Sequence, residues 1–143
     1  MIIRFKQWVE NIQPGETSGK PAMFNPNAQP VTKLLTVNEI LKSIHGIPYW
    51  NNIIEDYDNK DYSWPVFTQV LKYANFMKEN PNSINNMPPI IVIDGKLQDG
   101  AHRISAINLL KDRIDSENSF WSTSKLKVNF YKKSDLIPGD YKI

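Results

Sequence analysis

The residues best suited to chemistry lie together in the run Asp99-Gly100-Ala101-His102-Arg103, where a short strand is expected to give way to a helix. A helix N-terminus presents backbone N–H groups and the positive end of the helix dipole, so it readily binds an anion. Gly100 leaves room for a phosphate to approach the backbone. Arg103 can add a bidentate, permanently charged clamp, and His102 can donate a hydrogen bond or carry charge near neutral pH. The run therefore predicts a phosphate-binding site.

Asp99 is an acid beside this predicted anion site, and its residue type allows three roles. It could hold a Mg²⁺ ion that bridges it to the phosphates. It could accept the proton of a hydroxyl, or it could simply cap the helix. For the run as a whole, the structural alternative is a hairpin followed by a capped helix with exposed polar residues, because Asp-Gly is a common turn pair.

The neighbouring segments explain how the run would be positioned. Residues 90–93 are Ile-Ile-Val-Ile, a β-branched run that predicts a buried strand. Asp94-Gly95 is a strong tight-turn signal, so residues 96–98 are expected to return as a short second strand. The apolar face from Ile104 to Leu110 then predicts the helix that begins after Gly100.

The rest of the chain supplies further elements. Residues 31–35 and 126–130 are predicted to form strands. Thr36 and Glu39 have the spacing of a capping box at the start of a helix. Ser63 is expected to cap a second helix that ends at Asn80-Pro81. The remaining expectations are a short amphipathic helix over 4–12, a long loop or arm over 13–30, irregular chain over 49–62 and 116–124, and a loose tail over 134–143.

Composition sets the class of protein. The chain has 143 residues, of which 41% are hydrophobic and 22% charged, with a net charge of +2, which is typical of one globular domain. We predict a single α/β (α+β) domain over residues 1–143, with a small mixed sheet flanked by helices. The chain has no cysteine, which excludes disulfides, thiolate zinc sites and thiol catalysis within it. Because no apolar run is long enough to span a bilayer and the N-terminus lacks a secretion signal, we expect no membrane partner and a cytoplasmic location.

The stretch from Ile93 to Ala106 resembles the signature of the ParB N-terminal/sulfiredoxin superfamily. The corresponding motif is Gly-Glu-Arg-Arg in ParB, Gly-Cys-His-Arg in sulfiredoxins and Asp-Gly-x-His-Arg in some free serine kinases. The resemblance covers residues 88–112 and, more loosely, residues 31–45. It implies a compact ParB/sulfiredoxin-like domain in which Gly100, His102 and Arg103 match positions that contact nucleotide phosphates. Members of this superfamily bind CTP, ATP or ADP, and several transfer or hydrolyse a phosphate.

Two departures from the family narrow this expectation. Ala101 stands where sulfiredoxins have their cysteine, so sulfinic-acid reduction by that mechanism is excluded. ParB partition proteins continue into a helix-turn-helix domain and a dimerisation domain, for which this chain is too short. A plasmid-partition clamp is therefore not expected from this chain alone.

The leading functional prediction is a nucleotide-dependent phosphotransferase or nucleotide hydrolase. Gly100, Ala101, His102 and Arg103 would hold the phosphates, and Asp99, His102 and Arg103 would act in catalysis. The expected cofactors are ATP, ADP or CTP and a Mg²⁺ ion at Asp99, and the acceptor would be an unidentified hydroxyl compound. The alternative is a non-catalytic nucleotide- or DNA-binding module that passes a signal to a partner protein. A DNA-acting enzyme is a third possibility, although no dense acidic cluster supports it.

Several other residues are secondary candidates. Glu39 is better explained by the capping box, but it lies where the kinase-like relatives hold an acidic residue. His45 lies at a predicted helix end, where a cation is favourable for ordinary dipole reasons. Ser105 follows the phosphate-binding run. The C-terminal lysines could track a nucleic-acid backbone or simply form a solvated face: Lys125, Lys127, Lys132 and Lys133.

Overall fold

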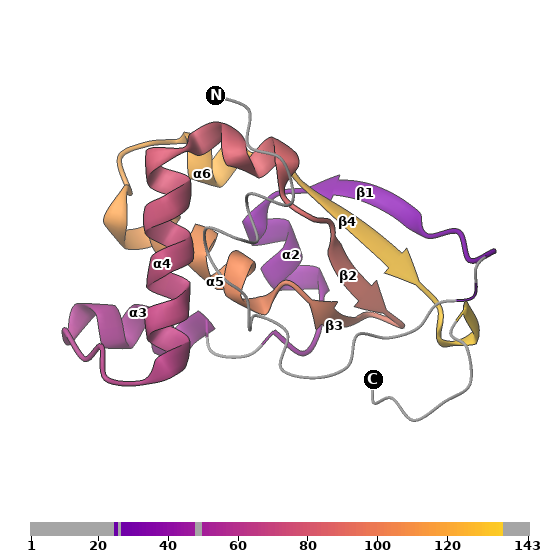
Figure 1. Ribbon diagram of the computed structural model, residues 1–143, viewed down its shortest axis with the longest axis horizontal. Coiled ribbons are helices and arrows are strands. Elements are labelled where there is room, and N and C mark those ends of the chain that lie inside the picture. Colours follow the sequence, from indigo (N-terminus) through magenta and orange to yellow (C-terminus); the bar gives the residue numbers. More distant parts are fainter. Residues whose placement is uncertain (1–24, 26, 48–49, 136–143) are drawn as a thin grey trace.

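The computed structural model describes residues 25, 27–47 and 50–135, which form a mixed sheet packed against helices (Figure 1). The four strands are β1 (Val31–Leu35), β2 (Ile90–Ile93), β3 (Lys96–Asp99) and β4 (Leu126–Tyr131), in the order β1-β4-β2-β3. β4 is antiparallel to β1 and parallel to β2, and β2 is antiparallel to β3. The predicted α/β (α+β) class with a small mixed sheet is confirmed.

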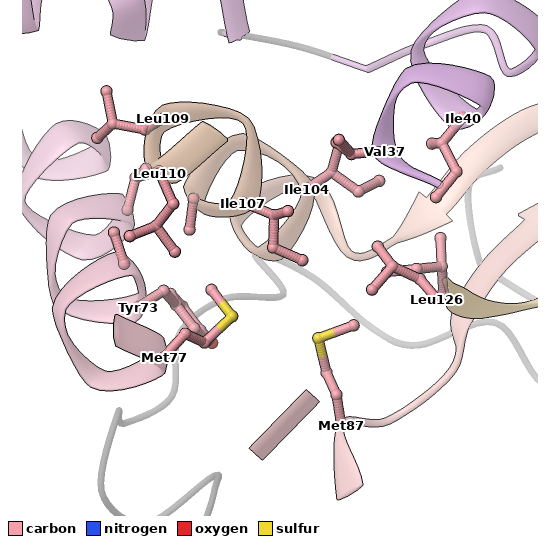
Figure 2. Packing of buried hydrophobic residues seen from close by; sticks show 14 of the residues in the cluster. Val37, Ile40, Tyr73, Met77, Met87, Ile104, Ile107, Leu109, Leu110 and Leu126 are labelled. Atoms are coloured by element: carbon pink, nitrogen blue, oxygen red, sulfur yellow. The ribbon is translucent and has the colours of Figure 1, made fainter. Parts of the chain in front are cut away.

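The helical elements surround one central helix, α5. In chain order they are α2 (Val37–Ser43), α3 (Trp50–Asp58), α4 (Pro65–Glu79), the 3₁₀ turn Pro81–Asn86, α5 (Ala101–Leu109), the π-helix Leu110–Ile114, α6 (Phe120–Thr123) and the 3₁₀ turn Lys133–Asp135. α5 contacts α2, α3 and α4, and every residue from Arg103 to Leu110 is buried. Figure 2 shows its side chains Ile104 and Ile107 among those of the neighbouring helices. A helix buried on all sides is expected to be apolar on all sides, so the buried polar residues of α5 are exceptions: Arg103, Ser105 and Asn108.

The two faces of the sheet have different neighbours. Ile90, Val92, Leu126 and Val128 are buried in the same cluster as the helix side chains. Strand alternation and the register, which sets Ile91 opposite Asn129, put the intervening residues on the other face. The helices therefore cover one face of the sheet, and the residues of β4 alternate between the core and the outer face.

Local sequence signals were confirmed where they were strongest. Thr36 begins α2 with the predicted capping box, in which its hydroxyl accepts the Glu39 N–H at 3.3 Å and its own N–H donates to Glu39 Oε1 at 2.9 Å. Asp94 and Gly95 both have positive φ angles, 49° and 80°, as a tight hairpin turn requires. The hairpin β2–β3, the helix after Gly100 and the strands β1 and β4 follow as predicted.

Three expectations about irregular or capped segments were wrong. Residues 49–62 contain α3, because Ile53, Ile54 and Tyr57 form a short apolar stripe that the surrounding Asn and Asp residues obscured. Ser63 does not cap α4, because the helix begins at Pro65 with Trp64 as its N-cap residue. The hydroxyl of Ser63 donates to Asp61 instead. Residues 116–124 contain the short helix α6, which buries Trp121.

Other expectations fall largely outside the described residues. These are the helix over 4–12, most of the arm over 13–30, and the tail beyond residue 135. Within the described part, Asn25 donates its N–H to the carbonyl of Asp135 at 2.7 Å. This hydrogen bond links the segment before β1 to the segment that follows β4.

A π-helix joins α5 to the loop that follows it. Its five residues, Leu110–Ile114, close with a bond from the Asp115 N–H to the Leu110 carbonyl at 2.9 Å. Arg113 reaches Asp58 at the end of α3, with Nε 2.6 Å from Oδ1 and Nη2 2.9 Å from Oδ2. This pairing lowers the pKa of Asp58, chiefly through the hydrogen bond from Arg113.

Asp115 anchors the loop between the π-helix and α6. Its Oδ2 accepts the indole Nε1–H of Trp121 at 2.8 Å and the Nδ2–H of Asn118 at 3.1 Å. The hydrogen bonds from Trp121 and then Asn118 hold the pKa of Asp115 below its ordinary value. Because Trp121 is fully buried, this carboxylate satisfies a donor that could not otherwise reach water.

We predict that Asp115→Asn lowers stability at neutral pH and that the difference disappears in acid. A carboxyl whose folded-state pKa is depressed stabilises the protein above its unfolded-state pKa, about 4, and loses this contribution as pH falls through the folded-state pKa. Urea unfolding of both proteins between pH 3 and 7 measures this. Glu117→Gln, an exposed acid in the same loop, is the control and should give no such trend. A difference for Asp115→Asn that stays constant down to pH 3 would contradict the prediction.

Candidate functional site

The predicted phosphate-binding run lies at the junction of β3 and α5, with Gly100 as the N-cap residue. Gly100 has φ 119° and ψ 7°, a conformation that side chains other than hydrogen rarely tolerate. A Cβ atom at this position would lie 2.5 Å from Ile90 Cδ1. Glycine is therefore required by the backbone angle and by the packing of β2, whether or not a ligand approaches.

Arg103 is buried beneath this junction rather than exposed as an open clamp. Its side chain has 0% of its surface accessible, Nη1 donates to the carbonyl oxygen of Pro88, and Nη2 lies 3.3 Å from Asp99 Oδ2. It thus ties the first turn of α5 to the segment before β2 and to the end of β3. A buried arginine needs such partners because an uncompensated charge in the interior is strongly unfavourable.

Asp99 connects this buried cation to the surface. Its side chain is 30% exposed, and it stands one helical turn before Arg103 in the chain. The structure thus adds an ion pair to the three roles that the sequence left open for this residue. The pair holds the carboxylate in a fixed place beside the start of α5.

Ala101 and His102 complete the surface of the junction, and both are half-buried. The imidazole of His102 lies beside the ring of Tyr73 on α4, with the ring centroids 6.4 Å apart and the planes at 45°. Gly100 and Arg103 lie below these residues in the interior. An anion at this junction would therefore meet the first-turn N–H groups and His102, with Arg103 beneath them.

The secondary candidates Glu39, His45 and Ser105 do not form part of the surface of the junction. Glu39 is engaged in the capping box of α2, and the Thr36 backbone N–H lowers its pKa more than any other group. His45 is bonded to the outer edge of β3, where its N–H donates to the Gly95 carbonyl at 2.9 Å. Because it lies opposite Lys96, about 10 Å of strand separates it from Asp99. Ser105 is 2% exposed and faces the interior of the molecule.

A Mg²⁺ ion would find few protein ligands here. Among residues 25, 27–47 and 50–135, no group of three or more His, Cys, Asp or Glu side chains could hold a metal ion. Asp99 offers one carboxylate, which already lies 3.3 Å from the Arg103 guanidinium. Mg²⁺ in proteins commonly binds through one or two carboxylates together with substrate phosphates. The residues therefore fit Mg²⁺ only as part of a nucleotide complex, not as a separate metal site.

Sequence reasoning missed two partners of this site. Tyr73 follows the spacing of the apolar stripe of α4 and is buried, so the helical period could have identified it. The Pro88 carbonyl could not have been identified from sequence, because a backbone acceptor carries no residue-type signal. Both partners come from segments that precede the motif in the chain: Tyr73 lies on α4, and Pro88 lies just before β2.

Comparisons with protein-family models, with curated proteins and with solved structures found no match. The resemblance to the ParB/sulfiredoxin superfamily therefore remains a prediction from the motif and its setting.

We predict that Gly100→Ala lowers the free energy of unfolding by about 2–5 kcal/mol, from a strained backbone angle and from overpacking against Ile90. The matched control is Gly95→Ala, where φ is also positive, 80°, but no atom lies within 4 Å of the added Cβ. That variant should lose only about 1–2 kcal/mol. Urea unfolding at neutral pH measures the free energy that each variant loses. Equal losses would contradict the prediction, because they would mean that Ile90 moves aside at no energetic cost.

Proposed function

We propose that this protein binds the phosphates of a nucleotide at the N-terminus of α5 and acts as a nucleotide-dependent phosphotransferase or nucleotide hydrolase. The observation that carries the proposal is the Gly100 junction. A nine-residue helix begins there with an N-cap that has no side chain to bond its first N–H groups. Ala101 and His102 lie at its surface, and such a helix start is suited to phosphate.

The charges around the junction support an anionic ligand of several phosphates. The helix dipole and the first-turn N–H groups act on the nearest phosphate, and His102 can donate to it or to the next one. Arg103 contributes a fixed positive charge below the turn, although its Asp99 partner offsets part of it. ATP, ADP and CTP share this polyphosphate chemistry, and they are the nucleotides that the family resemblance implies.

Asp99 would take part in the chemical step as the proton acceptor. In transfer, the oxygen of an acceptor hydroxyl or water bonds to the terminal phosphorus, the bond to the bridging oxygen breaks, and the acceptor proton passes to the Asp99 carboxylate. Arg103 would act as a positioning residue, because it holds that carboxylate at the junction. Mg²⁺ would arrive with the nucleotide and neutralise phosphate charge, with Asp99 as the protein residue able to reach it.

A second candidate function is a non-catalytic nucleotide-binding module that signals to a partner protein. The observation that favours it is the ion pair itself, which binds Asp99 and Arg103 to each other and to the Pro88 carbonyl. Two of the three residues expected to act in catalysis are thus engaged in holding the fold. In this alternative, the effect of nucleotide binding would be transmitted to the partner protein through α5 and the helices that pack on it.

A cytoplasmic location is part of the proposal, since nucleotides are plentiful there. In the described part of the chain, every helix is too short or too polar to cross a membrane. The acceptor remains an unidentified hydroxyl compound, because no contact at the junction selects one.

We predict that Ala101→Glu weakens nucleotide binding at least tenfold, about 1.4 kcal/mol. The added carboxylate would repel phosphate, yet an acid in the first turn favours the helix, so the fold should persist. Calorimetric titration with ATP, ADP, CTP and GTP in the presence of Mg²⁺ measures the change. Asn38→Glu, which adds the same charge to the exposed first turn of α2, is the control and should bind as the parent does. If the parent protein binds none of these nucleotides, or Ala101→Glu binds equally well, the phosphate site is wrong.

We predict that Asp99→Asn lowers the free energy of unfolding, because Arg103 loses its carboxylate partner. In protein that urea unfolding shows to be folded, it should also lower phosphate release or transfer at least a hundredfold, as loss of a general base would. Two reactions are measured: release of phosphate to water, and transfer of phosphate to each of a panel of hydroxyl compounds. Gln98→Glu, one residue earlier on β3, is the control for a local change of charge. Binding by the parent without any turnover would favour the non-catalytic module.

A further inference from the structure

β1 is an edge strand, and in the described part of the chain no strand pairs with its outer side. Figure 1 shows it at the border of the sheet, with β4 beside it. At the opposite edge, the His45 N–H donates to the Gly95 carbonyl at 2.9 Å, and the Leu97 N–H donates to the His45 carbonyl at 2.8 Å. An edge strand presents N–H and C=O groups that can pair with another chain. The described residues therefore shield part of one edge of the sheet and leave the other edge open.

The hydrogen bonding of β4 shows which main-chain groups of β1 point away from the sheet. The Tyr131 carbonyl accepts an N–H from the turn after β2 at 3.0 Å, so the main chain of Tyr131 is directed toward β2. Successive residues of a strand direct these groups to alternate sides, so Phe130 is directed toward β1, where it pairs with Val31. By the same alternation, Thr32 and Leu34 direct their N–H and C=O groups away from β4. We call these groups the open edge; among the described residues they form no hydrogen bond outside the sheet.

The open edge is short because the chain closes it at both ends. Pro30, two residues before Thr32, has no N–H to donate. The N–H of Thr36, two residues after Leu34, already donates to Glu39 Oε1 at 2.9 Å. The main-chain groups of Thr32 and Leu34 are therefore the ones that a further strand could use.

Exposed apolar side chains lie beside the open edge. Val31 is 61% exposed and Leu34 is 59% exposed, and these are two of the three large hydrophobic side chains that are exposed in the described part of the chain. Leu34 lies opposite the exposed Lys127, so both belong to the outer face of the sheet. Lys33 lies opposite the buried Val128, so Lys33 and Val31 belong to the face toward the helices. An added strand would therefore gain main-chain hydrogen bonds and apolar contact on both faces.

The charges beside the open edge are positive. Lys33 is exposed on β1 itself, with its Nζ 5.5 Å from the centroid of the Phe130 ring, and Lys127 is exposed on the adjacent strand. Residues 25–36 contain no Asp or Glu, so β1 of a second copy could not offer a carboxylate to either lysine. Charge complementarity therefore favours a partner strand that carries an acidic residue over a second copy of this chain.

We propose that the open edge of β1 binds an extended segment of a partner protein, acidic and apolar in composition, which adds to the sheet as a further antiparallel strand. Main-chain hydrogen bonds to Thr32 and Leu34 would give the affinity, as in other cases of strand addition. A glutamate opposite Lys33, with apolar residues opposite Val31 and Leu34, would give the specificity. β4 and β2 lie between this edge and β3, so the inference concerns a surface separate from the α5 junction and does not depend on it.

The probe is the fluorescein-labelled peptide Ser-Thr-Val-Glu-Thr-Val-Ser, in which antiparallel pairing places the glutamate opposite Lys33. Fluorescence anisotropy with the full chain should show saturable binding with a Kd below about 1 mM. An N-methyl group on the first valine, whose N–H would pair with Leu34, should weaken binding at least tenfold. An N-methyl group on the glutamate, whose N–H would point to solvent, should change the Kd less than threefold. Absence of saturable binding, or equal losses for the two methylated peptides, would overturn the inference.

A charge exchange tests the predicted register. Lys33→Glu should weaken binding of the probe about fivefold or more, and it should restore binding of a peptide in which lysine replaces the glutamate. Lys72→Glu, which makes the same change at an exposed position of α4, is the control and should lose less than threefold. Failure of the exchanged pair to recover affinity would show that the glutamate does not lie beside Lys33 and would overturn the inference.

Two further measurements separate this surface from other modes of binding. Sedimentation of the parent protein should show a monomer. A dimer that Leu34→Asp dissociates would overturn the inference in favour of a second copy paired at β1. Ala101→Glu should leave peptide binding unchanged, and a loss of affinity in that variant would overturn the inference by placing the peptide at the α5 junction.

Discussion

The structure depends on how one buried arginine is accommodated. Arg103 lies within α5, which is buried from Arg103 onward, and its charge is compensated by the Asp99 carboxylate and the Pro88 carbonyl among its partners. These partners require the end of β3, the segment before β2 and the first turn of α5 to meet at one point. Because a charge without partners in the interior would cost several kcal/mol, this requirement acts together with apolar packing in fixing the geometry of the Gly100 junction.

The same constraint explains why the junction has a surface layer and a buried layer. Gly100 allows the close approach of Ile90, which brings β2 near enough for Pro88 to accept from Arg103. Asp99, Ala101 and His102 are left at the surface, where an anion could meet them. If the junction binds an anion as proposed, structural and ligand-binding requirements fall on adjacent residues of one five-residue motif.

Sequence reasoning succeeded where the signal was local. The hairpin at Asp94-Gly95, the capping box of Thr36 and the apolar run of β2 each depend on residues within four positions of one another. It failed for α3, whose short stripe around Ile53 lies in a polar segment, and for α6, which is one turn long. It proposed the residues of the candidate site but did not foresee the burial of Arg103, because that burial depends on segments distant in sequence, namely the chain at Pro88 and the helices that pack on α5.

The π-helix that ends α5 has a consequence for how this part of the chain tolerates change. A π turn holds one more residue than an α turn, so Leu110–Ile114 behaves as an α-helix into which a single residue has been inserted. The extra residue rotates the chain that follows, and Arg113 then faces Asp58 on α3. Shortening this segment by one residue would restore a regular helix but turn Arg113 away from its partner. The length of the segment, and not only its composition, is therefore under constraint.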